Sequence, residues 1–222
     1  MARVWSIVVA GGSGRRFGER KQFSSLGGRP VLSWAVDACR AASDGVVVVI
    51  PADAESTSHS GADAVVTGGA TRAESVRRGL EAVPTDVDVI VVHDAARPLA
   101  PPALFSTVLE ALHEDGVVGA VPGLSPSDTI KVVDGHMNVT TTLDRTTLVA
   151  VQTPQAFRAE ALRAAHGRAE NTSDAVATDD AMLVESSGGR VRVVPGLPNN
   201  IKITTPDDLV TAERLLAAAP EA

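Results

Sequence analysis

Short valine-rich runs alternate with helix-like segments along the first half of the chain, and this order constrains the fold more than any other feature. Each run is apolar nearly throughout, as expected for a strand buried on both faces of a sheet. The predicted strands are Val4–Val9, Val46–Ile50, Ala64–Val66, Val87–Val92 and Val117–Val121, and the predicted helices are Val31–Ala41, Thr71–Ala82 and Pro102–Glu114. The repeated β-α-β order predicts an α/β fold with a mostly parallel sheet and helices on both faces.

The length and the charge of the chain limit the kind of protein it can be. A chain of 222 residues with 44% hydrophobic content predicts one domain, residues 1–222. A net charge of −7 argues against a surface for broad contact with nucleic acid. The single cysteine, Cys39, cannot form an internal disulfide, no zinc-site spacing is present, and no apolar run reaches the length of a membrane span. We expect a cytoplasmic protein with neither nucleic acid nor membrane as a partner, and a strand rather than a signal peptide at its N-terminus.

The sequence texture changes between residues 127 and 151. Here polar and apolar residues alternate around Asp134-Gly135, which is a strong hairpin signal. We therefore expect a β-ribbon that projects from the main sheet. Because a two-stranded ribbon is only marginally stable alone, it should lie against its own domain or against a second subunit. The chain then ends in an amphipathic helix near Asp207–Ala218, with Thr205 as N-cap and Pro206 as its first residue.

A glycine-rich loop, residues 10–18, follows the first predicted strand. Ligands bind α/β sheets beyond the carboxyl ends of their strands, and glycines let backbone N–H groups approach an anion. The dinucleotide motif fails because Phe17 stands where glycine is required, and no Walker A motif is present. The loop and the residues just after it carry clustered cations, which repel one another unless they are solvated or face an anion such as a triphosphate. These cations are Arg15, Arg16, Arg20 and Lys21.

Several motifs in order give the chain a family resemblance. The segment from Ala10 to Arg16, with Lys21-Gln22, resembles the signature of nucleotidyltransferases that activate sugars and sugar alcohols. Four later segments narrow the resemblance: His93–Pro98, Asp128–Lys131, Gln152–Gln155 and Asn200–Thr204. Together they resemble the 2-C-methyl-D-erythritol 4-phosphate cytidylyltransferase family, IspD, of the non-mevalonate isoprenoid pathway. The resemblance implies a Rossmann-like fold of the nucleotide-diphospho-sugar transferase type, a homodimer with the ribbon as its dimerisation arm, and transfer of CMP from CTP with release of pyrophosphate.

The resemblance also implies roles for residues around CTP. Arg16 and Lys21 would bind the CTP phosphates and stabilise the transition state, with Mg²⁺ or another divalent cation on the phosphate oxygens. Asp94 would lie near the metal and the acceptor hydroxyls. CTP would also contact Ala10, Gly11, Gly12, Ser13, Gly14, Gly69, Ala70, Ser75 and Ala95. The chain departs from the family in three ways. Arg20 stands where proline is expected and the loop is shorter than usual, and both differences affect how far Lys21 can reach. Ala70 stands where relatives often have an acidic residue, so backbone contacts would have to recognise the base there.

The same resemblance implies an acceptor site. Arg145, Thr129 and Lys202 would hold the incoming phosphate, and Arg97 and Thr153 would contact the substrate. Arg145 and Lys202 are also assigned to catalysis, and the arm would carry Thr129 and Arg145 into the site of a neighbouring subunit.

Structural roles stay open for several of these residues. Asp94 and Arg97 could pair to shape a turn, Gly68-Gly69 could be a tight turn before a helix, and Thr153-Pro154 could be an ordinary turn. We interpret His93 as a hydrogen-bonded core residue and Asp179-Asp180 as a helix N-cap with a first-turn acid rather than a metal site.

Three other functions compete with this one. A ribitol 5-phosphate cytidylyltransferase would share most motifs, although Asp128–Lys131 and Asp144-Arg145 favour the methylerythritol phosphate. A dinucleotide-dependent oxidoreductase is weakened by Phe17. A non-catalytic nucleotide-binding module is disfavoured because the residues assigned to catalysis occur together; these are Arg16, Lys21, Asp94, Arg145 and Lys202.

Overall fold

The computed structural model describes residues 2–12, 17, 20–52, 54, 61–170 and 178–218 of the chain. Its strands are β1 (Val4–Val9), β2 (Ser25–Leu26), β3 (Arg29–Pro30), β4 (Gly45–Ile50), β5 (Ala64–Thr67), β6 (Val89–Asp94), β7 (Val117–Leu124), β8 (Lys131–Val133), β9 (Val139–Thr142), β10 (Ala150–Val151), β11 (Gln155–Arg158) and β12 (Arg190–Pro195). Its helices are α1 (Val31–Ala41), α2 (Arg72–Ala82), α3 (Pro102–Ala111), α4 (Ala159–Glu170), α5 (Asp180–Ser186) and α6 (Pro206–Ala218), with 3₁₀ turns η1 (Lys21–Phe23) and η2 (Arg145–Thr147).

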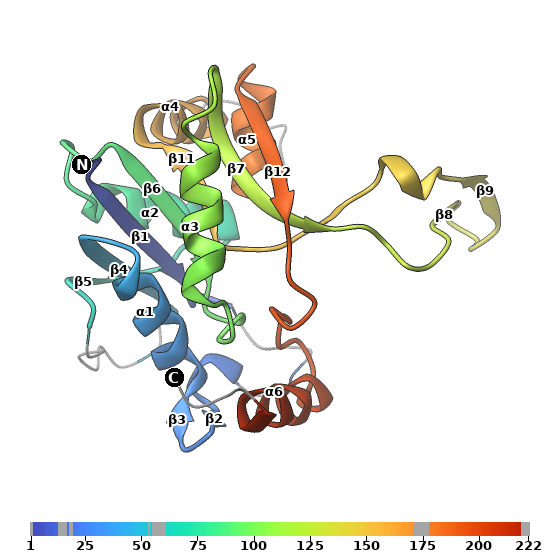
Figure 1. The fold of residues 1–222 in the computed structure, drawn as a ribbon, viewed down its shortest axis with the longest axis horizontal. Helices are drawn as coiled ribbons and strands as arrows, with labels where there is room; N and C mark the ends of the chain where they lie inside the picture. The colour runs from blue at the N-terminus through green and yellow to red at the C-terminus, as the bar shows by residue number, and fades with distance from the viewer. Residues whose placement is uncertain are drawn as a thin grey trace.

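An eight-stranded sheet forms the centre of the described structure (Figure 1). β1 pairs in parallel with β4 on one side and with β6 on the other, and β5 extends the sheet beyond β4. β11 is antiparallel and lies between β6 and β7, and β12 pairs with β7 in parallel. The prediction of a mostly parallel sheet is confirmed. The sequence interpretation missed β11 and β12, whose polar residues interrupt the apolar runs that mark the other strands.

Helices cover both faces of the sheet, as predicted. One buried cluster joins α1 and α3 to alternate strand residues such as Val46, Val48 and Val91. A second cluster joins α2, α4 and α5 to the intervening residues, including Ile7, Val47 and Val49. Because successive strand residues point to opposite faces, a valine-rich strand such as β4 supplies both clusters.

Several element boundaries differ from the prediction by a few residues, among them those of β6 and the end of α3. β6 is Val89–Asp94 rather than Val87–Val92, so Asp94 closes the strand itself. α3 ends at Ala111 rather than Glu114, because its last turn tightens: Leu112 N donates to Leu109 O and His113 N to Glu110 O. α6 begins at Pro206, with Asp208 N donating to Thr205 Oγ1 at 3.4 Å, which agrees with the predicted N-cap. A small cluster that includes Leu26, Ile203 and Ala212 packs α6 against the body.

The hairpin predicted at 127–151 projects away from the sheet as an arm (Figure 1). Its turn is longer than Asp134-Gly135 suggests: Asp134 Oδ1 accepts hydrogen bonds from His136 N and Asn138 N, both at 2.9 Å. Met137, with φ 64°, adopts the left-handed conformation instead of Gly135.

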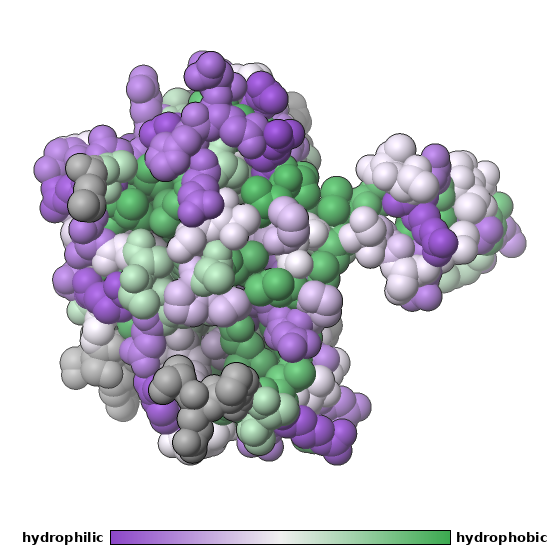
Figure 2. Space-filling view, viewed as in Figure 1, coloured by the Kyte–Doolittle hydropathy of each residue, from purple (hydrophilic) through white to green (hydrophobic). Residues whose placement is uncertain are grey.

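The arm does not pack on its own domain. Residues 131–147 are all exposed, with Met137 77% and Val139 58% accessible, and the arm forms a separate lobe in Figure 2. The first of the two placements that the sequence allowed is therefore wrong. None of the helices in the described part of the chain combines the length and the apolar character that crossing a bilayer requires.

Candidate active site

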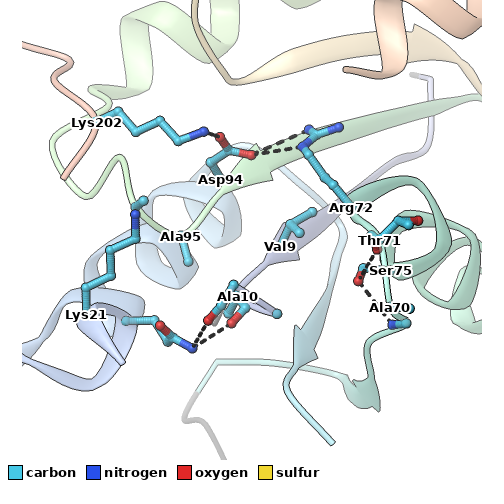
Figure 3. A pocket seen from close by; sticks show the side chains of 15 residues that line it. Val9, Ala10, Lys21, Ala70, Thr71, Arg72, Ser75, Asp94, Ala95 and Lys202 are labelled. Atoms are coloured by element: carbon cyan, nitrogen blue, oxygen red, sulfur yellow. Dashed lines mark hydrogen bonds and ion pairs between the residues drawn. The ribbon is translucent and has the colours of Figure 1, made fainter. Parts of the chain in front are cut away.

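A cleft of about 330 Å³ opens beyond the carboxyl ends of β1 and β6 (Figure 3). This is the edge at which parallel sheets bind ligands. Backbone from the end of β1, from the turn before α2 and from the end of β6 forms its walls, and lysines from two distant segments reach it. The lining residues are Val9, Ala10, Gly11, Gly12, Lys21, Gln22, Gly69, Ala70, Thr71, Arg72, Ser75, Asp94, Ala95, Ala96 and Lys202.

Hydrogen bonds to neighbouring strands and to Gln22 hold the backbone that follows β1. Ala10 N donates to Val49 O at 2.8 Å, and Ala95 N donates to Val9 O at 3.1 Å, so the wall continues the hydrogen bonding of the sheet. Buried Gln22 donates from Nε2 to Ala10 O at 2.9 Å and to Gly12 O at 3.3 Å. Gln22 therefore fixes the path of the chain into the glycine loop.

The turn before α2 requires its glycines. A Cβ on Gly68 would lie 2.9 Å from Ser75 Oγ, and one on Gly69 would lie 2.2 Å from the Glu74 side chain. Ser75 Oγ accepts from Gly69 N at 3.1 Å and donates to Thr71 O at 2.8 Å. Gly68-Gly69 is thus a tight turn before a helix, which is the structural role that the sequence left open. Gly69 also lines the cleft.

Ala70 does not face the cleft with a free amide. Its N–H donates to Glu74 Oε2 at 2.8 Å, and Thr71 Oγ1 caps α2 by accepting from Glu74 N at 3.1 Å. This reciprocal arrangement resembles a capping box. Glu74 thus binds the backbone of the turn at the start of α2.

Two lysines meet at the cleft from distant parts of the chain. Lys21 donates from Nζ to Ile203 O at 2.5 Å, and Lys202 donates from Nζ to Asp94 Oδ2, also at 2.5 Å. Figure 3 shows the Lys202 side chain directed toward Asp94. The segment that carries Lys202 and Ile203 thus contacts both the predicted phosphate-binding lysine and the predicted acidic residue.

Asp94 is held ionised by its neighbours. Burial alone raises the pKa of this carboxyl, but the charges of Arg72 and Lys202 outweigh it, and the pKa lies well below its ordinary value. Arg72 contacts Asp94 Oδ1 through Nε at 3.4 Å and Nη2 at 3.5 Å. The proposed pairing of Asp94 with Arg97 is not the one formed, since Arg97 donates from Nη1 to Asn200 O at 2.6 Å.

The sequence interpretation overlooked Arg72. A signal was present, because Arg72 and Ser75 are three residues apart at the start of a predicted helix and so share a face. A lone arginine on a helix is usually solvated, and nothing in the sequence placed Asp94 beside it.

His93 is a core residue, as interpreted from the sequence. Its ring is fully buried, which lowers its pKa to about 4 against the opposing charge of Asp94. Thr153 Oγ1 accepts from Asp94 N at 3.0 Å and lies 3.1 Å from His93 Nδ1, while His93 Nε2 lies 3.1 Å from Arg97 O. The network assigns the proton to Nε2, because the carbonyl of Arg97 can only accept, and the Thr153 hydroxyl then donates to Nδ1. His93 and Thr153 therefore fix the end of β6 under Asp94.

A second cleft, of about 300 Å³, adjoins the first and shares Arg72, Asp94 and Lys202 with it. It adds two residues that were predicted to contact the acceptor, Arg97 and Thr153. It also adds residues that the sequence interpretation did not assign to the site; these are Val151, Gln152, Gln155, Thr178 and Asp179. Asp179 caps α5, accepting from Met182 N at 3.0 Å, so the predicted N-cap is confirmed.

Asp180 differs from the simple first-turn acid that was expected. It is buried and pairs with Arg72 Nη1 at 2.7 Å and with His166 Nε2 at 2.9 Å.

The structure brings together most of the predicted site residues. The first cleft contains Ala10, Gly11, Gly12, Lys21, Gly69, Ala70, Ser75, Asp94, Ala95 and Lys202. Thr129 and Arg145 belong to the arm and line neither cleft, and Arg145 donates from Nη1 to Ser127 O at 2.5 Å. Ser13, Gly14 and Arg16 lie outside the described residues.

The donor set at the cleft suits a cation that takes most of its ligands from a substrate. Among the described residues, no group of three His, Cys, Asp or Glu side chains could hold a metal ion. Mg²⁺ is commonly bound through one or two carboxylates and substrate phosphates, and Asp94 offers one ionised carboxylate between the two clefts. Asp94 therefore fits a metal that arrives with a nucleotide.

Comparisons with known proteins agree on one family. The model of 2-C-methyl-D-erythritol 4-phosphate cytidylyltransferase, IspD, matches residues 4–218. A protein of that name from Rhodococcus jostii (strain RHA1) is 47% identical over 220 residues, covering 96% of this chain and 95% of the relative. The crystal structure of the enzyme of that name from Thermus thermophilus has a TM-score of 0.82 at 36% identity, covering 96% of this chain and 98% of that chain. The corresponding structure from Francisella tularensis has a TM-score of 0.83 at 27% identity, covering 96% and 100%.

Proposed function

The chain belongs to the 2-C-methyl-D-erythritol 4-phosphate cytidylyltransferase (IspD) family, and we propose that the two adjoining clefts perform the reaction of that family with the residues assigned below. The reaction transfers CMP from CTP to 2-C-methyl-D-erythritol 4-phosphate, and it forms 4-diphosphocytidyl-2-C-methyl-D-erythritol and pyrophosphate for isoprenoid synthesis. The matched relatives bear this name, and they give no support to a ribitol 5-phosphate enzyme, a dinucleotide-dependent oxidoreductase or a non-catalytic module.

One observation carries the assignment of the clefts. Lys202, from the segment before α6, and Asp94, from β6, contact each other where the two clefts meet. An oxygen of the acceptor phosphate must attack the α-phosphorus of CTP, and the pyrophosphate oxygen must leave on the opposite side. Both reactants are anions, so positive groups at their junction lower the barrier by offsetting charge repulsion.

The first cleft takes CTP in this proposal. The backbone of Ala10–Gly12 and Gly69, with the Ser75 hydroxyl, would surround the cytosine and ribose. Lys21 would bind the triphosphate from the opposite wall, together with Arg16, Ser13 and Gly14 of the glycine loop. Because nucleotidyl transfer needs no covalent intermediate on the enzyme, alignment and charge are the main contributions of these residues.

Asp94 would hold a divalent cation, for which Mg²⁺ is the natural choice beside phosphates. When bound, such a cation neutralises phosphate oxygens and stabilises the departing pyrophosphate. The low pKa of Asp94 keeps its carboxylate ionised and able to act as a ligand.

The second cleft takes the acceptor phosphate. Lys202 would contact this phosphate while keeping Asp94 in place. Arg97 lines the cleft, and its buried Nε has no hydrogen-bond partner among the residues that the structure describes. That atom is a candidate hydrogen-bond donor to the sugar-alcohol phosphate. Thr153 also lines this cleft.

The arm would complete the acceptor site of a second subunit through Thr129 and Arg145. Its support is the exposed apolar surface of a ribbon that is marginal by itself, with Val132, Val133 and Val139 accessible. We propose a homodimer in the cytoplasm that exchanges arms in this way.

Complementation tests the shared site. Lys202→Ala and Arg145→Ala would each leave a homodimer with only a small residual activity toward the acceptor, but a mixed dimer would hold one site with neither change. Random reassociation of equal amounts of the two variants should restore about a quarter of the unaltered activity, since half of the dimers are mixed and each has one intact site. No recovery in dimers proven to be mixed, or an active monomer at assay concentrations, would contradict an arm that reaches the neighbouring site.

Pyrophosphate release tests the reaction as a whole. With CTP and Mg²⁺, methylerythritol phosphate should be turned over, whereas ribitol 5-phosphate, or UTP in place of CTP, should be poor. Turnover of ribitol phosphate alone would refute the acceptor assignment.

A further inference from the structure

A chain of charged contacts runs from the active site into the body of the protein. Lys202 contacts Asp94, Asp94 contacts Arg72, Arg72 contacts Asp180, and Asp180 contacts His166. The outer members line the clefts, whereas the side chains of Asp180 and His166 are 1% and 2% exposed. Removal of Asp180 would leave Arg72 with one carboxylate partner instead of two.

The guanidinium of Arg72 contacts the carboxylates of Asp180 and Asp94 at different distances. Its Nη1 lies 2.7 Å from Asp180 Oδ2, which is a close charge-assisted hydrogen bond. Its Nε and Nη2 lie 3.4 and 3.5 Å from Asp94 Oδ1, at the edge of hydrogen-bonding distance. Arg72 is therefore anchored to Asp180 and only approaches Asp94.

Asp180 is itself held by contacts from two helices. Asp180 is in the first turn of α5, which Asp179 caps, and its Oδ1 accepts from His166 Nε2 on α4. The charges of Arg72 and Asp180 compensate each other, since burial opposes ionisation of Asp180 but Arg72 and His166 lower its pKa. Loss of the Asp180 charge would free the guanidinium to move onto Asp94.

We propose that Asp180 is a positioning residue that restrains Arg72, so that Arg72 makes only long contacts with Asp94 Oδ1 and leaves this oxygen accessible to the ligands of the cleft. An unrestrained arginine would form the bidentate pair that guanidinium and carboxylate favour. Asp94 would then be occupied by the protein rather than by substrate or its cation. This inference rests on the proposed function, because it concerns the availability of Asp94 during cytidylyl transfer.

Asp180→Asn tests the proposal, since it removes the charge with little change of shape. We expect kcat to fall about 10- to 100-fold, the scale expected when a reacting geometry is disturbed by a small displacement. The Kd of CTP, measured by calorimetry without acceptor or metal, should stay within about threefold, because the backbone walls of that cleft are unchanged. Glu185→Gln is the matched control: it removes a negative charge from an exposed position on the same helix and should leave kcat unaltered.

A double variant shows whether Asp180 acts through Arg72. In an Arg72→Met chain no guanidinium remains to be restrained, so adding Asp180→Asn should not lower kcat further. Any of three results would overturn the proposal. The first is a double variant whose loss of kcat is the product of the two single losses, and the second is an unchanged kcat in Asp180→Asn. The third is a loss of CTP binding in Asp180→Asn as large as its loss of kcat.

Arg72→Lys covers the case in which Asp180→Asn does not fold. Lysine keeps the charge but cannot contact both carboxylates through a planar fork, so kcat should fall while CTP binding is retained. Full activity of Arg72→Lys would also overturn the proposal. Inactivity of the unaltered chain would instead refute the proposed function, so the two failures are distinguishable.

Discussion

Lys202→Ala gives the sharpest test of how the two clefts share their charges. Lys202 Nζ is 2.5 Å from Asp94 Oδ2, and the residue borders both clefts. Alanine removes a positive group that is assigned to the acceptor phosphate, and it leaves Asp94 with the long contacts of Arg72. The substitution should therefore weaken use of the acceptor more than binding of CTP, because the base and ribose of CTP are assigned to the opposite end of the first cleft.

The size of the effect follows from the exposure of the side chain. A hydrogen bond to a charged group contributes about 1.5–3 kcal/mol. Because the Lys202 side chain is 42% exposed, solvent screening places it in the lower half of that range. A loss of about 1.5–2 kcal/mol corresponds to a 10- to 30-fold decrease in kcat/KM for the acceptor. The Kd of CTP should change by less than about threefold.

Steady-state pyrophosphate release at saturating CTP measures the first quantity, and calorimetric titration with CTP measures the second. Arg190→Ala is a suitable control, because it removes a positive charge from an exposed strand end outside both clefts. Equal losses for acceptor and CTP would show that Lys202 serves the nucleotide, and the division of the clefts given above would be wrong.

Three further predictions concern buried groups. Ser75→Ala should destabilise the fold by about 1–2 kcal/mol and raise the KM for CTP, since Gly69 N loses its acceptor; urea unfolding and kinetics test this, and a stability loss without a KM change would make Ser75 purely structural. The pKa of His93 is about 4 when folded against an ordinary 6.5, so the unfolded chain gains a proton first and stability should fall by about 3 kcal/mol as the pH drops through that window. Unfolding at pH 7 and pH 4.5 should show a smaller difference for His93→Gln, and an equal difference would exclude His93 as the cause. Burial raises the pKa of Cys39 to about 12, so the native protein should resist thiol reagents at pH 8 and react once unfolded; rapid native labelling would contradict its burial.

Much of the fold could be predicted because local patterns carried it. β4 is apolar at every position and α2 begins with a capping threonine, so both elements are readable from neighbouring residues alone. β11 was missed because its four residues, Gln155–Arg158, have no pattern of their own. Its position between β6 and β7 is decided by pairing partners far away in the sequence.

The residues of the active site likewise fall into those that the sequence predicted and those that only the structure revealed. The residue types that suit an anion, glycines beside lysine and an aspartate at a strand end, were visible as motifs, and so Lys21, Asp94 and Lys202 were found. Arg72 and Asp180 were not, because their role exists only once α2 and α5 bring them within 2.7 Å of each other.

The sequence by itself determined the α/β class, the parallel core and the family, because these depend on local periodicity and on motifs of adjacent residues. Only the tertiary structure decided which partner each charge has: Asp94 binds Lys202 and Arg72 rather than Arg97, and Asp180 is buried rather than solvated. The physical reason is that electrostatic energy depends on distance and on burial in three dimensions, and neither quantity is fixed by separation along the chain.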